Sequence, residues 1–178
     1  MDILSHGLWT GAASKFANIK IKKPLNIRLA VFWGIFPDLL SFALPFVWLA
    51  YGLAFGGLSF SDLPRPDTTE PAPSDTLPIF RLTSLFYNLS HSAIVFAVIF
   101  GIVYFILRRP VWEMSAWLLH VLIDIPTHSY RFYPTPFLWP LSEWKFDGLS
   151  WATPWFLILN YSAIIIVYFL LRRKTLQQ

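Results

Sequence analysis

The chain has 178 residues, a formal net charge of +4 and a composition that argues against an ordinary water-soluble domain. Hydrophobic residues make up 56% of it and charged residues 13%, whereas about 25% of the residues in a soluble domain are charged. The absence of cysteine excludes disulfides and thiolate metal ligands. The basic residues flank apolar runs, so we expect a membrane protein and no nucleic-acid partner.

Five helical segments are predicted, and in chain order they cover residues 2–16, 29–61, 82–107, 111–125 and 148–171. Segments 82–107 and 148–171 are both longer than the roughly 20 residues that a helix needs to cross a membrane. Pro37 and Pro45 are expected to break or kink the long second segment. Pro126 is expected to end the fourth, short segment.

Basic residues mark one end of the predicted segments. They form three clusters, at Lys15–Arg28, Arg108–Arg109 and Arg172–Lys174, which we interpret as the cytoplasmic face. The other face would then carry a Pro-rich acidic loop at 59–78 and an aromatic loop at 126–149, whose Trp and Tyr residues suit the headgroup layer. Because backbone groups in lipid must bond internally, we predict a single all-α, multi-pass integral membrane bundle of about five segments, two of them short.

All four histidines and two aspartates lie inside otherwise apolar segments or just past their ends. They are His6, Asp38, His91, His120, Asp124 and His128. The strongest local signal is the pair His120 and Asp124, because residues four apart share one face of a helix. Beyond Pro126, His128 can fold back as a third ligand.

Counting from the basic ends places these residues at one depth. At about 1.5 Å per helical residue, five of them on four segments lie roughly 13 to 25 Å from the basic ends. Burying Asp38 and Asp124 as bare carboxylates would cost several kcal/mol each, and a bound cation would remove most of that cost. We therefore predict that all six bind a divalent metal, with zinc best suited to imidazoles and carboxylates. For any one residue alone, a hydrogen bond between helices explains it about as well.

Five further residues are weaker candidates, each with a plainer alternative. Asn88 and Arg131 can bind substrate, although a polar contact between helices and a lipid-interface anchor are the simpler roles. Glu143 and Asp147 can add metal ligands, but we favour solvated loop charges. Asp2 can join the site, but we favour a role in the first turn of its helix.

Several stretches that contain these residues resemble one family. The matching strings are residues 1–6 (MDILSH), 37–38 (PD), 87–92 (YNLSHS), 120–129 (HVLIDIPTHS) and 136–148 (PFLWPLSEWKFDG). The chain resembles, over nearly its whole length, the membrane-bound metal-dependent hydrolases described as LexA-binding and inner membrane-associated. The resemblance implies a bacterial inner membrane protein with hydrolase activity.

The order of the six residues is also similar, more distantly, to that of the zinc-dependent phospholipases C. Those enzymes use an early His, an Asp, a further His, an HxxxD pair and another His. The similarity implies zinc and a phosphoester substrate. Those enzymes add a later His and Glu for another zinc, and this chain has no histidine after His128.

The function that we predict is metal-dependent hydrolysis, with a lipid or lipid-linked phosphoester near the outer leaflet as substrate. Asp38 is the candidate general base, because a carboxylate beside the metal can accept a proton from water. Two alternatives remain at this point. An ion or proton pathway would string ionisable residues across the membrane, and a non-catalytic scaffold would hold a structural metal with every ligand position filled by protein.

Overall fold

The computed structural model describes residues 1–59, 78–130 and 133–175, and within these ranges the chain is all-helical with no strand. The elements are α1 (Ile3–Asn18), α2 (Ile27–Phe55), α3 (Pro78–Ser90), α4 (Ala93–Leu107), the 3-10 turn η2 (Trp112–Met114), α5 (Ser115–Thr127) and α6 (Pro154–Thr175). The predicted helical bundle is confirmed. Most of the predicted acidic loop, residues 60–77, lies outside the described ranges.

Two helices, α2 and α6, are long and apolar enough to cross a membrane, and α3 with α4 would make a third span if the bent pair counts as one. The two helices of that pair meet at an angle of 64°. The prediction of one continuous helix over 82–107 is therefore wrong. The chain forms two helices there, and His91 and Ser92 lie at the break.

Ser92 and a distant loop account for the break. The hydroxyl of Ser92 accepts hydrogen bonds from the backbone N–H groups of Ile94 (3.1 Å) and Val95 (3.2 Å), which makes Ser92 the N-cap of α4. The same hydroxyl donates to the carbonyl of Trp139, and the N–H of Ala93 donates to the carbonyl of Phe137 at 3.0 Å. The loop thus satisfies backbone groups that a break inside an apolar segment would otherwise leave unpaired.

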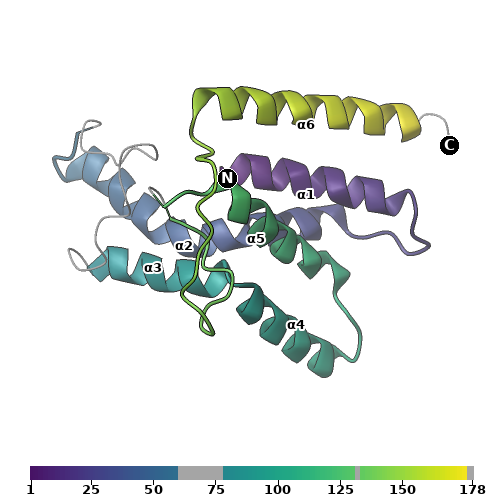
Figure 1. Cartoon of the computed structure of the whole chain (residues 1–178), viewed down its shortest axis with the longest axis horizontal. Coiled ribbons are helices and arrows are strands. Elements are labelled where there is room, and N and C mark those ends of the chain that lie inside the picture. Colours follow the sequence, from purple (N-terminus) through teal and green to yellow (C-terminus); the bar gives the residue numbers. More distant parts are fainter. Residues whose placement is uncertain (60–77, 131–132, 176–178) are drawn as a thin grey trace.

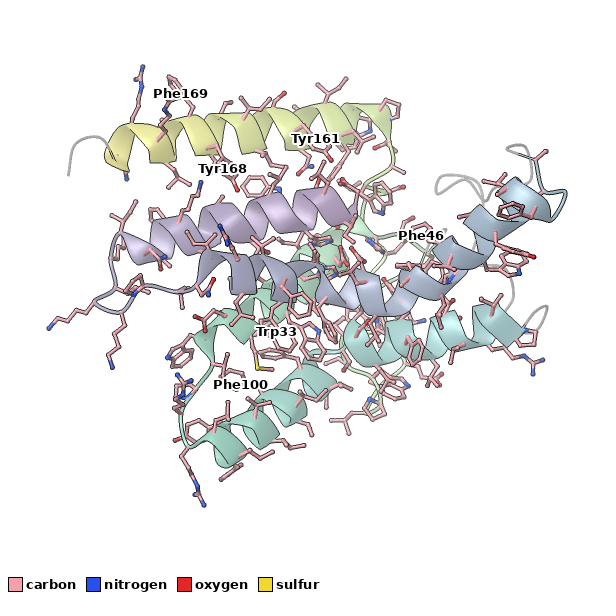
Figure 2. The ribbon with its side chains drawn as sticks, turned by 180° about the vertical axis from the view of Figure 1, so that it is seen from behind. Trp33, Phe46, Phe100, Tyr161, Tyr168 and Phe169 are labelled. Atoms are coloured by element: carbon pink, nitrogen blue, oxygen red, sulfur yellow. The ribbon has the colours of Figure 1, made fainter. Side chains whose placement is uncertain are left out.

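The prolines of α2 do not break it. Pro37 and Pro45 lie inside a helix that continues for 29 residues, and Figure 2 shows its ribbon bending along the way. The carbonyl of Pro37 accepts hydrogen bonds from the hydroxyls of Ser41 (2.8 Å) and Ser90 (3.2 Å). These bonds tie the end of α3 to the middle of α2.

Helix α1 lies between α6 and the layer of α2 and α5 (Figure 1). Its approach to α2 is close, because a Cβ on Gly34 would lie 2.2 Å from the hydroxyl oxygen of Thr10. On the other side, Trp9 donates to the side-chain oxygen of Asn160 at 2.8 Å, and Tyr168 donates to the carbonyl of Leu8 at 3.0 Å. Helix α1 is therefore fixed on both sides.

The predicted basic clusters share one end of the bundle. Figure 1 shows the α1–α2 connection, the α4–α5 connection and the end of α6 on the same side. Which side of a membrane this end faces stays a prediction.

The segment that precedes α6 crosses the end of α5. Its backbone N–H groups donate from Gly148 to His128 (2.8 Å), from Leu149 to Pro126 (2.9 Å) and from Trp151 to Thr127 (3.1 Å). Pro126 itself lies within the last turn of α5, which ends one residue beyond it. The aromatic loop therefore packs on the helix that carries His120 and Asp124, whatever contacts it makes with lipid.

Gly148 is required at this crossing, because a Cβ there would lie 2.4 Å from the backbone oxygen of Pro126. We expect Gly148→Ala to lower the free energy of unfolding by about 1–3 kcal/mol, as overpacking does. Gly101→Ala is the matched control, since a Cβ on Gly101 in α4 meets nothing within 4 Å. Thermal unfolding in detergent should show a lower midpoint for the first variant and no loss for the second; equal midpoints would contradict the close crossing.

Candidate metal centre

The structure brings all six predicted residues into one buried region from three helices, the break between α3 and α4 and the end of α5. His6 lies in the first turns of α1, Asp38 in the middle of α2, His91 at the α3–α4 break, His120 and Asp124 one turn apart on α5, and His128 at the C-cap of α5. His6, His91, His120 and Asp124 have no exposed surface.

Four of these residues form a compact group of ligand atoms: Asp38, His91, His120 and Asp124. Their ligand atoms all lie within 4.8 Å of one another. The Nε2 atoms of His91 and His120 are 3.1 Å apart. They lie 3.4 and 3.1 Å from Asp124 Oδ2, and 3.5 and 3.7 Å from Asp38 Oδ1.

These separations suit a small metal ion. Four tetrahedral ligands at about 2.0–2.2 Å from an ion are separated from one another by about 3.3–3.6 Å. The five measured separations lie between 3.1 and 3.7 Å. The donor set, two imidazoles and two carboxylates, is also one that divalent metals use.

The second ring nitrogen of His120 fixes which atom faces the group. Nδ1 lies 2.7 Å from the carbonyl oxygen of Gly34 on α2. A carbonyl only accepts, so Nδ1 carries the hydrogen and, in a neutral ring, Nε2 presents its lone pair to the other three ligand atoms. A single proton on His91 Nε2 cannot hydrogen-bond to His120 Nε2, Asp38 Oδ1 and Asp124 Oδ2 at once. A cation between the four ligand atoms would attract all of them. Such outer hydrogen bonds typically orient metal-binding histidines.

Two carboxylate oxygens without hydrogen-bond partners also indicate a cation site. Asp38 Oδ2 and Asp124 Oδ2 are buried and have no hydrogen-bond partner. Across the described part of the chain, neither carboxylate forms an ion pair with a lysine or arginine. An uncompensated buried carboxylate costs several kcal/mol. The α-amino group of Met1 pairs with Asp124 through Oδ1, whereas no described lysine or arginine supplies charge to Asp38 or to Asp124 Oδ2. A cation bound between these two carboxylates would lower that cost.

The other oxygen of Asp124 faces a second group. Oδ1 lies 2.9 Å from His6 Nε2 and 3.4 Å from His128 Nε2. The α-amino group of Met1 donates to the same oxygen and lies 2.7 Å from His128 Nε2. The four histidines therefore divide between the two oxygens of Asp124, with His91 and His120 at Oδ2 and His6 and His128 at Oδ1. The sequence suggested His128 as the third ligand beside His120 and Asp124, whereas His128 faces Asp124 Oδ1 and the compact group contains Asp38.

Two tyrosines that the sequence analysis missed, Tyr87 and Tyr133, contact the histidines His91 and His128. The ring of Tyr87 stacks on His91, with centroids 3.8 Å apart, and its hydroxyl donates to the carbonyl of Tyr133 at 2.7 Å. That carbonyl also lies 2.7 Å from His128 Nδ1. Tyr133 has a φ of +42°, an unusual value for a residue with a side chain. Tyr87 precedes His91 by four residues, a spacing that could have indicated it; no local signal marks Tyr133.

None of the weaker candidates that the structure describes belongs to the compact group. Glu143 and Asp147 are exposed in the loop, as the interpretation as solvated charges expects. Asn88 is half-buried on α3 and its substrate-binding role stays a prediction. Arg131, the other candidate for substrate binding, lies outside the described residues.

Asp2 is the N-cap of α1, which is the role that we favoured. Its carboxylate accepts hydrogen bonds from the N–H of Ser5 at 2.9 Å and from the hydroxyl of Tyr161 at 2.8 Å. Burial raises the pKa of Asp2, but the hydrogen bonds from Ser5 and Tyr161 outweigh it and hold that pKa below its usual range. Asp2 thus helps to fix the start of the helix that carries His6.

No protein-family model, curated protein or solved structure matches this chain. The site is therefore interpreted from its own geometry, and the family resemblance stays a prediction.

Loss of either α5 ligand should remove the metal. We expect purified His120→Ala and Asp124→Ala to lose most of the divalent metal that the wild type holds, because each deletes an atom that faces the other members of the group. Asp147→Ala is the matched control, since it removes an exposed carboxylate. Elemental analysis measures the outcome. Equal metal content in all four proteins would rule out this centre.

His6→Ala should reduce the metal content less than His120→Ala does. The His6 ring faces Asp124 through Oδ1, whereas the compact group uses Oδ2. The same elemental analysis tests this difference. If both variants lost metal equally, His6 and His120 would share one ion and the division of Asp124 between two groups would be wrong.

Proposed function

We propose that the chain is a membrane-bound, metal-dependent hydrolase that acts on a phosphoester in a lipid or lipid-linked molecule. The observation that carries this proposal is the buried group of Asp38, His91, His120 and Asp124, with its spacing and its unpaired carboxylate oxygens. When bound, a divalent cation supplies Lewis acidity, which lowers the pKa of water and polarises a phosphoryl oxygen. Zinc is the cation that we propose for two imidazoles with carboxylates.

Asp38 distinguishes a catalytic centre from a structural one. A structural zinc has every position filled by protein, whereas a catalytic one keeps a position open. Asp38 Oδ1 lies 3.5 and 3.7 Å from the two imidazoles, which is close to the separation of a fourth ligand, so its distance does not decide its role. The exposure of its side chain, 10% where the other three have none, favours an open position beside it. We assign His91, His120 and Asp124 as ligands and Asp38 as the residue beside the open position.

The second oxygen of Asp38 suits a general base. Oδ2 is buried, has no hydrogen-bond partner and is carried by the same carboxyl group that faces the two imidazoles. A carboxylate in that position can take a proton from water as the water attacks phosphorus. Asp38 is also the most open member of the group, with 10% of its side chain exposed where the other three have none. Substrate would therefore reach the centre from the Asp38 side.

A lipid substrate fits the surroundings of the centre. Asp38 belongs to α2, one of the two helices that are apolar and long enough to cross a membrane. We propose a multi-pass protein of the bacterial inner membrane, with its basic end in the cytoplasm and the centre nearer the outer leaflet. A phosphoester held at the headgroup layer then lies close to the depth of the metal.

The clustering of the histidines and buried aspartates in one place argues against an ion or proton transport protein. A conducting pathway needs ionisable side chains in succession across the membrane. In the described part of the chain, the histidines and the buried aspartates Asp38 and Asp124 belong to one contiguous cluster instead.

Asp38→Asn should separate catalysis from metal binding. The amide keeps an oxygen at the site but cannot accept the proton, so hydrolysis should fall by about 10²–10⁴-fold. Most of the metal should remain, because His91, His120 and Asp124 are intact. Rates are measured on a chromogenic phosphodiester and on phospholipid in mixed micelles, beside elemental analysis.

Asp147→Asn, an exposed loop carboxylate, is the matched control and should keep full activity. If metal-loaded wild type hydrolysed neither substrate, the centre would be structural and the hydrolase proposal would fail. If Asp38→Asn hydrolysed at the wild-type rate, Asp38 would not be the base.

A further inference from the structure

Four cationic side chains gather on aromatic rings where α1 and α6 end. The ammonium groups of Lys20 and Lys174 both lie over the ring of Phe16, 4.7 and 5.7 Å from its centroid. Lys15 lies 4.9 Å from the ring centroid of Tyr168. One residue before Lys174, the guanidinium of Arg173 lies 4.4 Å from the ring centroid of Phe169. Two chain segments far apart in sequence thus place like charges on one ring.

The packing of α6 on α1 holds this cluster of Lys15, Lys20, Arg173 and Lys174 together. Tyr168 donates to the carbonyl of Leu8, and its hydroxyl lies close above Gly11, where a Cβ would approach it to 2.7 Å. In Figure 2, Tyr168 lies between α6 and α1, whereas Phe169 lies on the outer side of α6. The contact between α1 and α6 is close, and it keeps Lys20 and Lys174 together over Phe16.

The cluster has too little negative charge around it. Two helix C-termini end here, and each supplies the equivalent of about half a negative charge. Against four cations, about three positive charges remain. No carboxylate among the described residues forms an ion pair with any of the four. Glu113, which lies near the start of α2, accepts a hydrogen bond from the backbone N–H of Asn26 at 3.0 Å instead. The cluster therefore favours an anion from outside the chain.

The rings around the charges show what kind of anion fits. Phe16 is 44% exposed, Phe169 is 54% exposed and Leu170 is 52% exposed, so one surface combines positive charge with open apolar area. A free inorganic anion would meet only the charges. A phospholipid meets both, because its phosphate can lie at the ammonium groups while its acyl chains cover the rings.

We propose that Lys20 and Lys174, with Lys15 and Arg173 beside them, bind the phosphate of an anionic glycerophospholipid whose acyl chains lie along Phe16 and Phe169. This site is at the basic end of the bundle, where α6 ends, and it uses none of the residues of the metal centre. It is a lipid-binding site that does not depend on whether the chain is a hydrolase.

The test compares two double variants of the full-length protein by native mass spectrometry in detergent. Lys20→Gln with Lys174→Gln removes the two charges over Phe16. Lys22→Gln with Lys23→Gln removes two exposed charges from the same basic end, neither of which lies over a ring in the described structure. Phosphatidylglycerol and phosphatidylcholine with identical acyl chains are titrated against each protein. Circular dichroism confirms that all three proteins remain helical.

We expect the wild type to retain phosphatidylglycerol in preference to phosphatidylcholine. The Lys20/Lys174 variant should bind phosphatidylglycerol about 30-fold more weakly, as expected for two lost charges at a headgroup. The Lys22/Lys23 variant should lose much less. A third double variant, Lys20→Arg with Lys174→Arg, is checked by circular dichroism in the same way and should retain binding. Equal losses in the two Gln variants would mean that only diffuse charge matters and would overturn the site. Competition by glycerol phosphate at the concentration of the lipid would also overturn it, because acyl chains would then contribute nothing.

Discussion

The carboxylates of Asp38 and Asp124, buried without a lysine or arginine partner in the described structure, are the constraint around which the rest is arranged. Removing a bare carboxylate from water costs several kcal/mol, which is comparable with the total stability of many domains. The chain surrounds these groups with imidazoles from separate elements and fixes His120 from behind through the carbonyl of Gly34. The α-amino group of Met1 pairs with one oxygen of Asp124, and a cation between Asp38 and the other oxygen of Asp124 would lower the remaining cost.

Irregular backbone lies where that arrangement needs it. The α3–α4 break turns His91 toward Asp124, and the freed groups beside it bond to the carbonyls of Phe137 and Trp139. In an apolar surrounding, such a break survives only when protein supplies the missing hydrogen bonds. The loop that supplies them also carries the Tyr133 carbonyl that holds His128. One loop therefore closes the break and orients a histidine.

The two ends of the bundle have different chemistry. Basic residues gather where α1 and α6 end, and the imidazoles and buried carboxylates gather around the start of α1 and the end of α5. Helix α1 contributes to both ends, with His6 near its start and Lys15 in its last turn. Its fixed position between α6 and α2 therefore sets the distance between the basic end and the cluster of imidazoles and carboxylates. A lipid phosphate at one end and a hydrolytic centre toward the other would then meet opposite leaflets.

The sequence by itself determined the all-helical fold, the basic end and the six residues of the cluster, because hydropathy, charge and the four-residue spacing of His120 and Asp124 are local properties. It did not predict the break at Ser92 or the roles of Tyr87 and Tyr133, and it left open whether Pro37 breaks α2 or only bends it. Those features depend on hydrogen bonds and ring contacts between residues far apart in the chain. Periodicity carries no signal for such contacts, so only the tertiary structure could decide which side of Asp124 each histidine faces.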